Sequence, residues 1–152
     1  KYKYEEVGGN FRLDTLQAAI LQVKLKYLDE WTENRKAHAH TYDSLFESSG
    51  ISIEKIVPPE IPGENHVFHQ YVIRARDRDS LRKYLKERDV QTGVYYPLPL
   101  HLQPCFQSLG YNRGDFPESE KASNEVLALP MYPELSKEAQ EYVVQTILGF
   151  YN

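Results

Sequence analysis

Apolar residues recur at helical spacing through the first third of the chain. Between positions 13 and 46 they fall three or four residues apart, and charged residues occupy the intervening positions. This pattern predicts one long helix over residues 13–48, which would measure about 50 Å at 1.5 Å per residue. Because that length exceeds the width of a small domain, we expect the helix to bend, to break or to extend beyond its own domain.

The pattern changes after Gly50, where shorter elements follow one another. Strands separated by helices predict a small mixed α/β domain over residues 49–152, with one sheet and with the long helix at its N-terminal edge. In order, we predict a proline-rich connector (56–65), a strand (67–75), a helix from Asp77 or Asp79 to Glu87, a strand (90–96), a loop punctuated by prolines, a helix (118–127), a turn (129–133) and a last helix capped by Ser136.

Composition narrows the classes of function. The 152 residues are 41% hydrophobic and 26% charged, and no uncharged apolar run approaches the roughly 18 residues of a membrane span. The net charge of -4 argues against a nucleic-acid partner, and acidic residues interrupt the basic segment 74–88, which we interpret as a solvated helix face. A single cysteine favours a reducing cytoplasm. A start at Lys1 rather than at Met indicates part of a longer polypeptide.

The five histidines do not form a metal-binding pattern. His38 and His40 lie two residues apart on the predicted helix, about 200° around its axis, so they cannot bind one ion. His66 and His69 lie three apart on the predicted strand and face opposite sides of it. We therefore expect no metal site.

A cysteine and a histidine four residues apart, Cys105 and His101, could form a thiol–imidazole pair, which would make the protein a hydrolase. Pro104 and the prolines before it disfavour a helix there, so we favour an inert cysteine beside a loop histidine. The chain contains no G-x-S-x-G, P-loop or G-x-G-x-x-G pattern.

The segment GGNFR (residues 8–12) comes directly before the long predicted helix. Backbone amides, the Asn10 carboxamide and the Arg12 guanidinium beside a helix N-terminus together favour an anion such as phosphate. The alternative is an ordinary start of a helix, with Asn10 or Asp14 as its cap.

The segment YYPLPLHLQP (residues 95–104) gathers two phenols, an imidazole and an amide in a rigid loop. Such a surface can bind a hydroxylated ligand through hydrogen bonds and ring contacts. The alternative is a loop packed by its own aromatic side chains.

Several segments match one protein family in order and spacing. They are KYKYEEVGGNFRLDTLQAAILQVKL, HVFHQYVIRA, VYYPLPLHLQPCF, LGYNRGDFPESEKASNEVLALPMYPEL and the final helix. On these segments, which cover essentially the whole chain, the protein resembles the C-terminal part of the DegT/DnrJ/StrS-type sugar aminotransferases. These are pyridoxal-phosphate enzymes that aminate keto-sugar nucleotides.

The resemblance implies a fold-type-I architecture, in which a large domain holds the cofactor. A long helix then leads to a smaller C-terminal α/β domain with a small, mostly antiparallel sheet. Residues 1–12 would form an interface and cofactor loop, 13–48 the connecting helix and 49–152 the small domain. The large domain, with the lysine that forms the Schiff base, would lie upstream, so this chain alone is expected to be inactive.

The resemblance also assigns residues to the cofactor. Asn10 would reach the pyridoxal-phosphate phosphate bound by the partner subunit of a homodimer, and Gly8 and Gly9 would let the backbone turn tightly to allow this. Arg12 would steer anionic groups nearby. Phe11 departs from the family, which often has Tyr at this position.

Further residues are assigned to the sugar-nucleotide substrate. Tyr95, Tyr96 and His101 would line its pocket, with His101 as the main hydrogen-bonding residue. His69 occupies a strand position where the family often has His, and would support the pocket or serve the structure. Tyr4 stands where many relatives have His, so if this position touches the substrate, the sugar preference inferred from those relatives does not carry over.

We therefore expect the whole protein to move an amino group to a keto group of a nucleotide-linked deoxysugar, with glutamate as the donor. The product would serve surface polysaccharide or deoxyaminosugar biosynthesis. The chemistry would be ping-pong, with the cofactor as electron sink, and the RLD form of the motif favours amination at C3 over C4. The alternative, from a different class, is a non-catalytic binding or dimerisation module.

Overall fold

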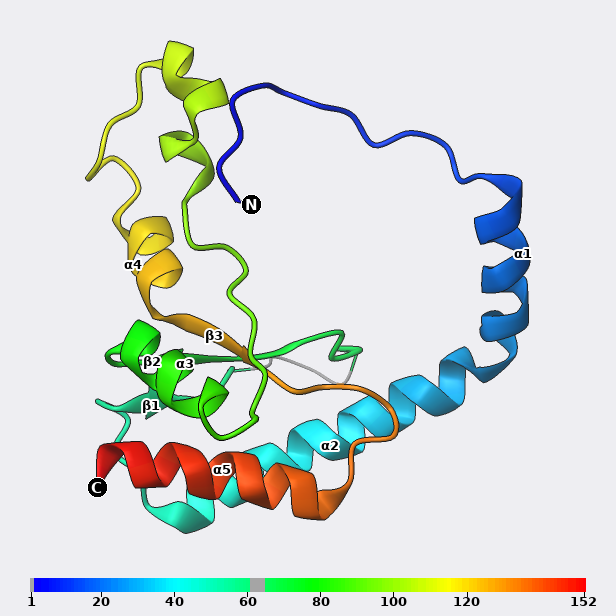
Figure 1. The fold of residues 1–152 in the computed structure, drawn as a ribbon, viewed down its shortest axis with the longest axis vertical. Helices are drawn as coiled ribbons and strands as arrows, with labels where there is room; N and C mark the ends of the chain where they lie inside the picture. Colours follow the sequence, from blue (N-terminus) through cyan, green and yellow to red (C-terminus); the bar gives the residue numbers. More distant parts are fainter. Residues whose placement is uncertain (1, 61–64) are drawn as a thin grey trace.

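A three-stranded antiparallel sheet lies at the centre of the C-terminal part of the molecule (Figure 1). The computed structural model describes residues 2–60 and 65–152, and the strands stand in the order β1 (Ile56–Val57), β2 (Tyr71–Ala75), β3 (Val126–Leu129). In the middle strand the alternate residues Tyr71 and Ile73 are completely buried. Aromatic and β-branched side chains suit such a pleated surface. The predicted arrangement of a small antiparallel sheet with helices is confirmed.

Two helices, α2 (Leu28–Ser49) and α5 (Lys137–Tyr151), lie side by side and pack with the sheet around the main core (Figure 1). Ser136 caps α5 as predicted, because its hydroxyl accepts a hydrogen bond from the Ala139 N–H at 3.2 Å. The buried apolar residues recur at helical spacing on both helices: Ala39, Tyr42 and Phe46 on α2, and Val143, Val144 and Ile147 on α5.

Shorter helices complete this part: α3 (Arg78–Lys86), α4 (Pro117–Glu125) and the 3-10 helices η2 (Leu100–Leu102) and η3 (Pro104–Leu109). Asp77 precedes α3 but makes no side-chain cap bond. The buried Arg78 side chain joins α3 to the end of α4, since it donates to the carbonyl oxygens of Ser123 at 3.1 Å and Val126 at 2.8 Å. No helix in the described part is long and apolar enough to cross a membrane.

The long helix predicted over residues 13–48 is broken, as its length led us to expect. It is divided into α1 (Thr15–Lys24), the 3-10 helix η1 (Leu25–Tyr27) and α2, and α1 runs at a clear angle to α2 (Figure 1). Gly50 ends α2 with a left-handed φ of 65°, a conformation that glycine adopts without steric cost. Helix α1 therefore leaves the core formed by the sheet, α2 and α5.

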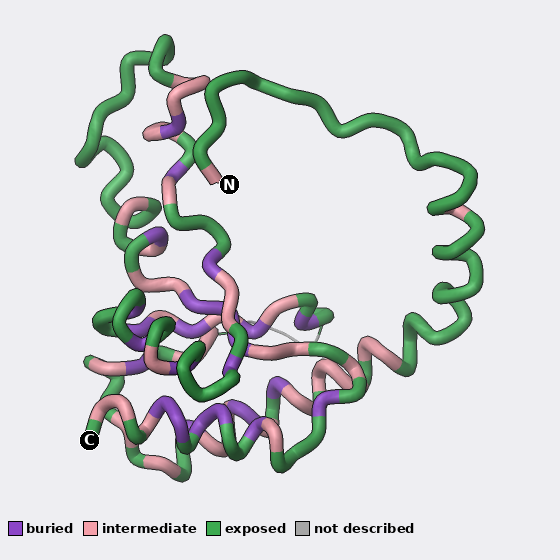
Figure 2. Tube along the Cα trace, in the orientation of Figure 1, coloured by how far each residue is buried: buried purple, intermediate pink, exposed green. Residues whose placement is uncertain are grey.

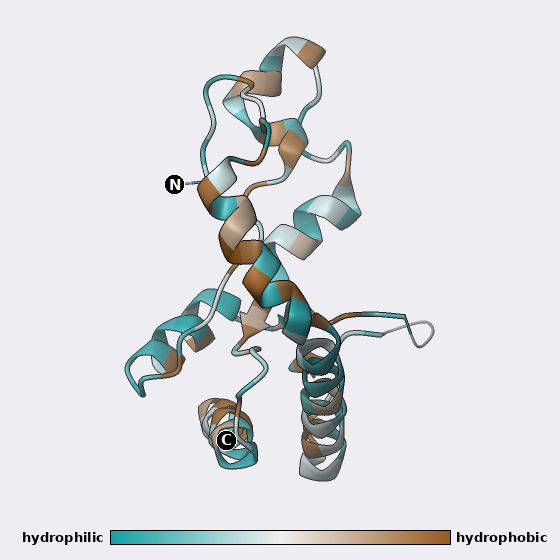
Figure 3. Cartoon of the chain, turned by 90° about the vertical axis from the view of Figure 1, so that its right-hand side faces the viewer, coloured by the Kyte–Doolittle hydropathy of each residue, from teal (hydrophilic) through white to brown (hydrophobic). Residues whose placement is uncertain are grey.

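Helix α1 contributes no buried residue, and together with the segment before it forms an exposed arc (Figures 1 and 2). Hydrophobic residues follow one another along this helix (Figure 3). A contiguous apolar surface of this kind marks a site that another surface covers. The α1 apolar surface consists of residues that are each more than half exposed: Leu13, Leu16, Ile20, Leu21, Val23 and Leu25.

Three predictions about strands are wrong. The strand predicted over residues 90–96 is reduced to one isolated bridge between Gly93 and Ala128, in a segment that runs into prolines, which cannot donate to a ladder. The strand predicted over residues 67–75 begins only at Tyr71, so His69 lies before it. Strand β1 lies inside the predicted proline-rich connector, of which residues 61–64 fall outside the described part.

The fourth correction concerns β3. We predicted that residues 118–127 form a helix and residues 129–133 a turn, whereas α4 ends at Glu125 and Val126–Leu129 forms a strand. The strand pairs with β2, in the register Tyr71 with Leu129 and Ile73 with Leu127. This pairing buries Leu127 and Leu129, so a contact distant in sequence decides the conformation.

A buried tyrosine links the middle strand to α2. The Tyr71 hydroxyl donates to Asp43 Oδ1 at 2.5 Å, and its ring lies 5.0 Å from that of Tyr42, whose hydroxyl donates to the Pro130 carbonyl oxygen. Burial, followed by the bond to Asp43, raises the pKa of Tyr71 well above its ordinary value of 10.0. The folded state thus keeps this hydroxyl protonated.

Replacing Tyr71 by Phe should lower the free energy of unfolding by about 1–3 kcal/mol near pH 7, because the half-buried Asp43 carboxylate loses its donor. Folding raises the pKa of Tyr71, so above pH 10.0 the unfolded chain loses this proton while the folded chain keeps it. The free energy of unfolding is therefore unaffected by this group below pH 10.0 and falls as the pH rises above it. Urea unfolding between about pH 8 and pH 11 should therefore show a weaker decline for Tyr71→Phe than for the wild type. Equal declines would contradict this account.

Candidate functional site

Residues 2–14, which lead into α1 and which we call the arm, form an open segment. Residues 7–14 contain no turn, and neither Gly8 nor Gly9 has a positive φ. A Cβ added at Gly8 would meet no atom within 4 Å. Our prediction of a tight Gly-Gly turn is wrong, because the backbone is open at these residues; the Phe11 ring lies against Gly9, 3.0 Å from the position of a Cβ added there.

The two predicted anion-binding residues lie on this arm and are exposed. Within the described residues, neither Asn10 nor Arg12 makes a hydrogen bond or an ion pair. Asp14 caps α1, with its Oδ1 accepting from the Gln17 N–H at 2.8 Å, so Asn10 is not the cap. The Asp14 carboxylate already occupies the positive end of the helix. An anion at this arm would therefore rely on the Asn10 carboxamide and the Arg12 guanidinium.

The start of the arm, at Tyr2 and Tyr4, is hydrogen-bonded to Gln103 and Cys105, at the junction of η2 and η3. The side chain of Gln103 is only 2% exposed, and its Oε1 accepts from the Tyr4 N–H at 3.0 Å while its Nε2 donates to the Tyr2 carbonyl oxygen at 3.0 Å. The Cys105 N–H donates to the Tyr4 carbonyl oxygen at 3.1 Å. These three hydrogen bonds, which we call the arm clamp, join segments about 100 residues apart in the chain.

The phenols of the predicted substrate loop are exposed and close together. Tyr95 and Tyr96 are joined by a cis peptide bond, and their rings lie edge to face with centroids 5.9 Å apart. The Tyr96 ring also meets the Tyr2 ring of the arm at 5.8 Å. The rings therefore pack on one another while both residues stay exposed, and ligand binding by this loop stays a prediction.

His101 is buried and paired. Its side chain is 7% exposed, and its Nε2 lies 3.0 Å from Glu120 Oε1, which also accepts the Gly114 N–H at 2.7 Å. The Gly114 hydrogen bond, and then His101, hold the pKa of Glu120 below its ordinary value. With Glu120 ionised, Nε2 of His101 is a donor, so Nδ1 of a neutral ring remains an acceptor.

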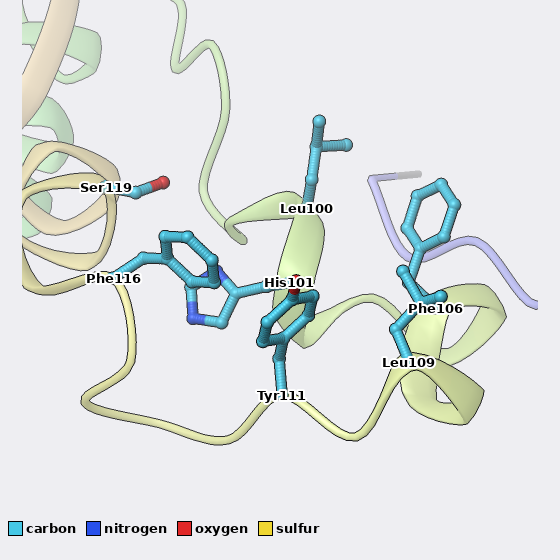
Figure 4. Close-up of a pocket in the computed structure, with 7 residues that line it drawn as sticks. All are labelled: Leu100, His101, Phe106, Leu109, Tyr111, Phe116 and Ser119. Carbon is cyan, nitrogen blue, oxygen red and sulfur yellow. The ribbon is translucent and has the colours of Figure 1, made fainter.

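The same histidine lines an apolar pocket of about 350 Å³, in which the rings of His101, Phe116 and Tyr111 gather (Figure 4). A second, more polar pocket of about 360 Å³ contains His69 and Tyr95 together with Gln91 and Thr92. The structure therefore brings His69 and Tyr95 to one pocket and places His101 in another.

Cys105 and His101 do not form a catalytic pair. His101 Nε2 is engaged by Glu120, and the half-buried Cys105 thiol has no hydrogen-bond partner among the described residues. In the part of the chain that the structure covers, no three His, Cys, Asp or Glu side chains cluster in a way that could hold a metal ion.

Two residues that shape the site escaped the sequence analysis. Gln103 was noticed only as the amide of the loop, since its bonds go to backbone atoms at the other end of the chain. Glu120 carries no local signal, because its partner His101 is 19 residues away. Only the tertiary arrangement identifies either role.

Comparison with known proteins identifies the family. A sequence model of the DegT/DnrJ/EryC1/StrS aminotransferase family matches residues 1–148. The "pleiotropic regulatory protein" of Geobacillus stearothermophilus is 55% identical over 151 residues, covering 99% of this chain and 40% of the relative. The dTDP-3-amino-3,6-dideoxy-alpha-D-galactopyranose transaminase of Aneurinibacillus thermoaerophilus is 37% identical over 147 residues, covering 95% of this chain and 39% of the relative.

A solved structure agrees. The crystal structure of DesV from S. venezuelae superposes with a TM-score of 0.83 at 34% identity, covering 99% of this chain and 40% of that chain. The chain thus spans about 40% of the length of the relatives it matches. From the family match over nearly every residue and from the shared fold, we conclude that the chain belongs to the DegT/DnrJ/EryC1/StrS aminotransferase family.

Proposed function

We propose that this chain acts as the C-terminal part of a transaminase that transfers an amino group from an amino acid, glutamate, to the keto group of a nucleotide-linked sugar. The family membership and the transaminase name of the Aneurinibacillus relative support this activity. We also propose amination at C3, which the RLD motif favours and which the 3-amino sugar in the name of the Aneurinibacillus relative supports. We further propose that the protein works in the cytoplasm, since its single cysteine suits a reducing compartment.

One observation carries the proposal: the arm has two side chains suited to phosphate, Asn10 and Arg12, that make no hydrogen bond or ion pair within the described chain. Both residues are exposed. An amide and a guanidinium two residues apart in sequence suit the phosphate of pyridoxal phosphate, because both donate hydrogen bonds to anionic oxygens. The residues present therefore fit that end of the cofactor.

Pyridoxal phosphate, when bound, supplies the electron sink that allows an amino group to change carriers. In this chain Asn10 and Arg12 would hold and orient its phosphate. We propose that the Schiff-base lysine and the remaining cofactor contacts come from a large domain, in keeping with the share of the relatives that this chain leaves uncovered. The chain alone would then be inactive.

The exposure of the arm and of α1 supports a homodimer. The α1 apolar surface is not covered in the chain, and burying it would contribute about 25 cal/mol for each Å² of apolar area. The arm that carries Asn10 is continuous with this helix. We propose that a second copy covers α1 and that Asn10 thereby reaches the cofactor of the partner subunit.

For the sugar nucleotide, we propose that Tyr95 and Tyr96 donate hydrogen bonds from their exposed hydroxyls to the sugar. His69, in the same pocket as Tyr95, would contribute a further polar group. His101 would line the neighbouring pocket and offer Nδ1, while Glu120 fixes the orientation of its ring. The buried ring thus acts from a set position rather than as a mobile side chain.

A second candidate is a non-catalytic binding or dimerisation module. The regulatory name of the Geobacillus relative favours it, as does the lack of a complete catalytic set within these residues. The two candidates differ in one property, since only the transaminase consumes an amino donor.

The full-length protein supplied with pyridoxal phosphate should convert glutamate to 2-oxoglutarate in an amount equal to the enzyme when no sugar is present. With a dTDP- or UDP-linked 3-keto sugar it should turn over many times. Run in reverse, a 3-amino sugar nucleotide and 2-oxoglutarate should yield glutamate. No 2-oxoglutarate under any of these conditions would leave the non-catalytic module as the better account.

Replacing Asn10 by Ala in the full-length protein should raise the dissociation constant for pyridoxal phosphate by about tenfold or more, because a hydrogen bond to a charged group contributes about 1.5–3 kcal/mol. Absorbance or fluorescence titration measures this constant. Asn124→Ala is the matched control, since Asn124 is also exposed, lies on α4 and makes no side-chain hydrogen bond among the described residues. Equal constants for the two variants would refute the role of Asn10.

A further inference from the structure

A buried amide holds the start of the arm. Gln103 uses both polar atoms of its carboxamide on the backbone of Tyr2 and Tyr4, and Cys105 adds a third bond to Tyr4. At 2% exposure the Gln103 carboxamide has little access to water. Withdrawal of the arm would therefore leave a buried donor and a buried acceptor unpaired, which opposes that movement.

The clamp limits where Asn10 can go. Asn10 lies six positions after Tyr4 in the chain. A fully extended chain spans at most about 3.3–3.6 Å per residue, so the two residues are at most about 20 Å apart. The other end of the arm is fixed by the Asp14 cap of α1. Asn10 is thus restrained from both sides, although no bond holds it directly.

The clamp also connects the arm to the substrate loop. Gln103 follows Tyr95 and Tyr96 in the same loop, and the Tyr2 ring lies against the Tyr96 ring at 5.8 Å. The buried Gln103 side chain therefore links the arm, which carries Asn10, to the loop that carries Tyr95 and Tyr96.

We propose that Gln103 is a positioning residue, which fixes the Asn10 arm relative to the Tyr95–Tyr96 loop so that cofactor phosphate and sugar are bound in a set relation. Gln103 touches neither ligand and acts only through the arm clamp. This proposal rests on the function proposed above. A glutamine suits the role because it offers one donor and one acceptor together, whereas a carboxylate offers only acceptors.

The test uses Gln103→Met in the full-length protein, which keeps the length of the side chain and removes both polar atoms. Hydrogen exchange at the Cys105 amide, whose acceptor lies on the arm, should lose most of its protection, because two of the three hydrogen bonds of the arm clamp are removed and the arm is open for most of the time. The dissociation constant for pyridoxal phosphate should rise by about fivefold, because Asn10 is less often in place. Gln103→Glu should also open the arm near pH 7, because a buried carboxylate has no proton to donate to the Tyr2 carbonyl oxygen.

A matched control is Gln140→Met. Gln140 is equally buried, at 1% exposure, and its Nε2 also donates to a backbone carbonyl, that of His38, but it joins α5 to α2 far from the arm in sequence. This control should lower the melting temperature and leave both the Cys105 exchange and the cofactor affinity at wild-type values. It separates positioning of the arm from general loss of stability.

Unchanged exchange at Cys105 in Gln103→Met would overturn the proposal, and so would faster exchange with wild-type cofactor affinity. If the wild-type protein bound no pyridoxal phosphate, the proposed function would fail. The exchange at Cys105 would then show by itself whether Gln103 fixes the arm.

Discussion

The packing of β2 against α2 and α5 is the constraint on which the rest of the structure depends. Ile73 and Ile147 are completely buried in this core, and the Tyr71 ring meets Tyr42 while its hydroxyl binds Asp43. Burial of these large side chains supplies the main stabilising term, at about 25 cal/mol for each Å² of apolar area. The buried Arg78 extends the same unit to α4 by hydrogen bonds. The elements of this unit thus have fixed neighbours within the chain.

The arm and α1 are not part of this core, and they form no apolar core of their own. Helix α1 has no buried residue, and the arm is held at its root by the three hydrogen bonds of the arm clamp. Their apolar and polar groups face outward, where we propose that a second copy and a cofactor phosphate meet them. On this account the chain carries two parts of an active site, Asn10 on the arm and the Tyr95–Tyr96 loop. Gln103 fixes the position of one relative to the other.

The sequence predicted those features that depend on neighbours along the chain. Helical periodicity located the helical region that contains α2 and the last helix, α5. Residue type identified Ser136 as a cap but left the cap of α1 open between Asn10 and Asp14, and the structure assigns it to Asp14. Strand β3 was missed because Val126–Leu129 becomes a strand through pairing with β2, which no local pattern reports. The pairing of His101 with Glu120 and the clamp of Gln103 were missed for the same reason, since their partners lie 19 and about 100 residues away. The open form of the Gly8–Gly9 arm could not be derived either, since we propose that the surface it meets lies outside this chain.

The most direct measurement of the central claim is a crystal structure of the full-length protein with pyridoxal phosphate. We expect two copies to bury the α1 apolar surface between them, with Gln103 still bonded to the backbone of Tyr2 and Tyr4. Asn10 Nδ2 should then lie about 2.7–3.2 Å from a phosphate oxygen of the cofactor that the other copy holds. An Asn10 side chain that remains in solvent, or an α1 surface left uncovered, would contradict the account.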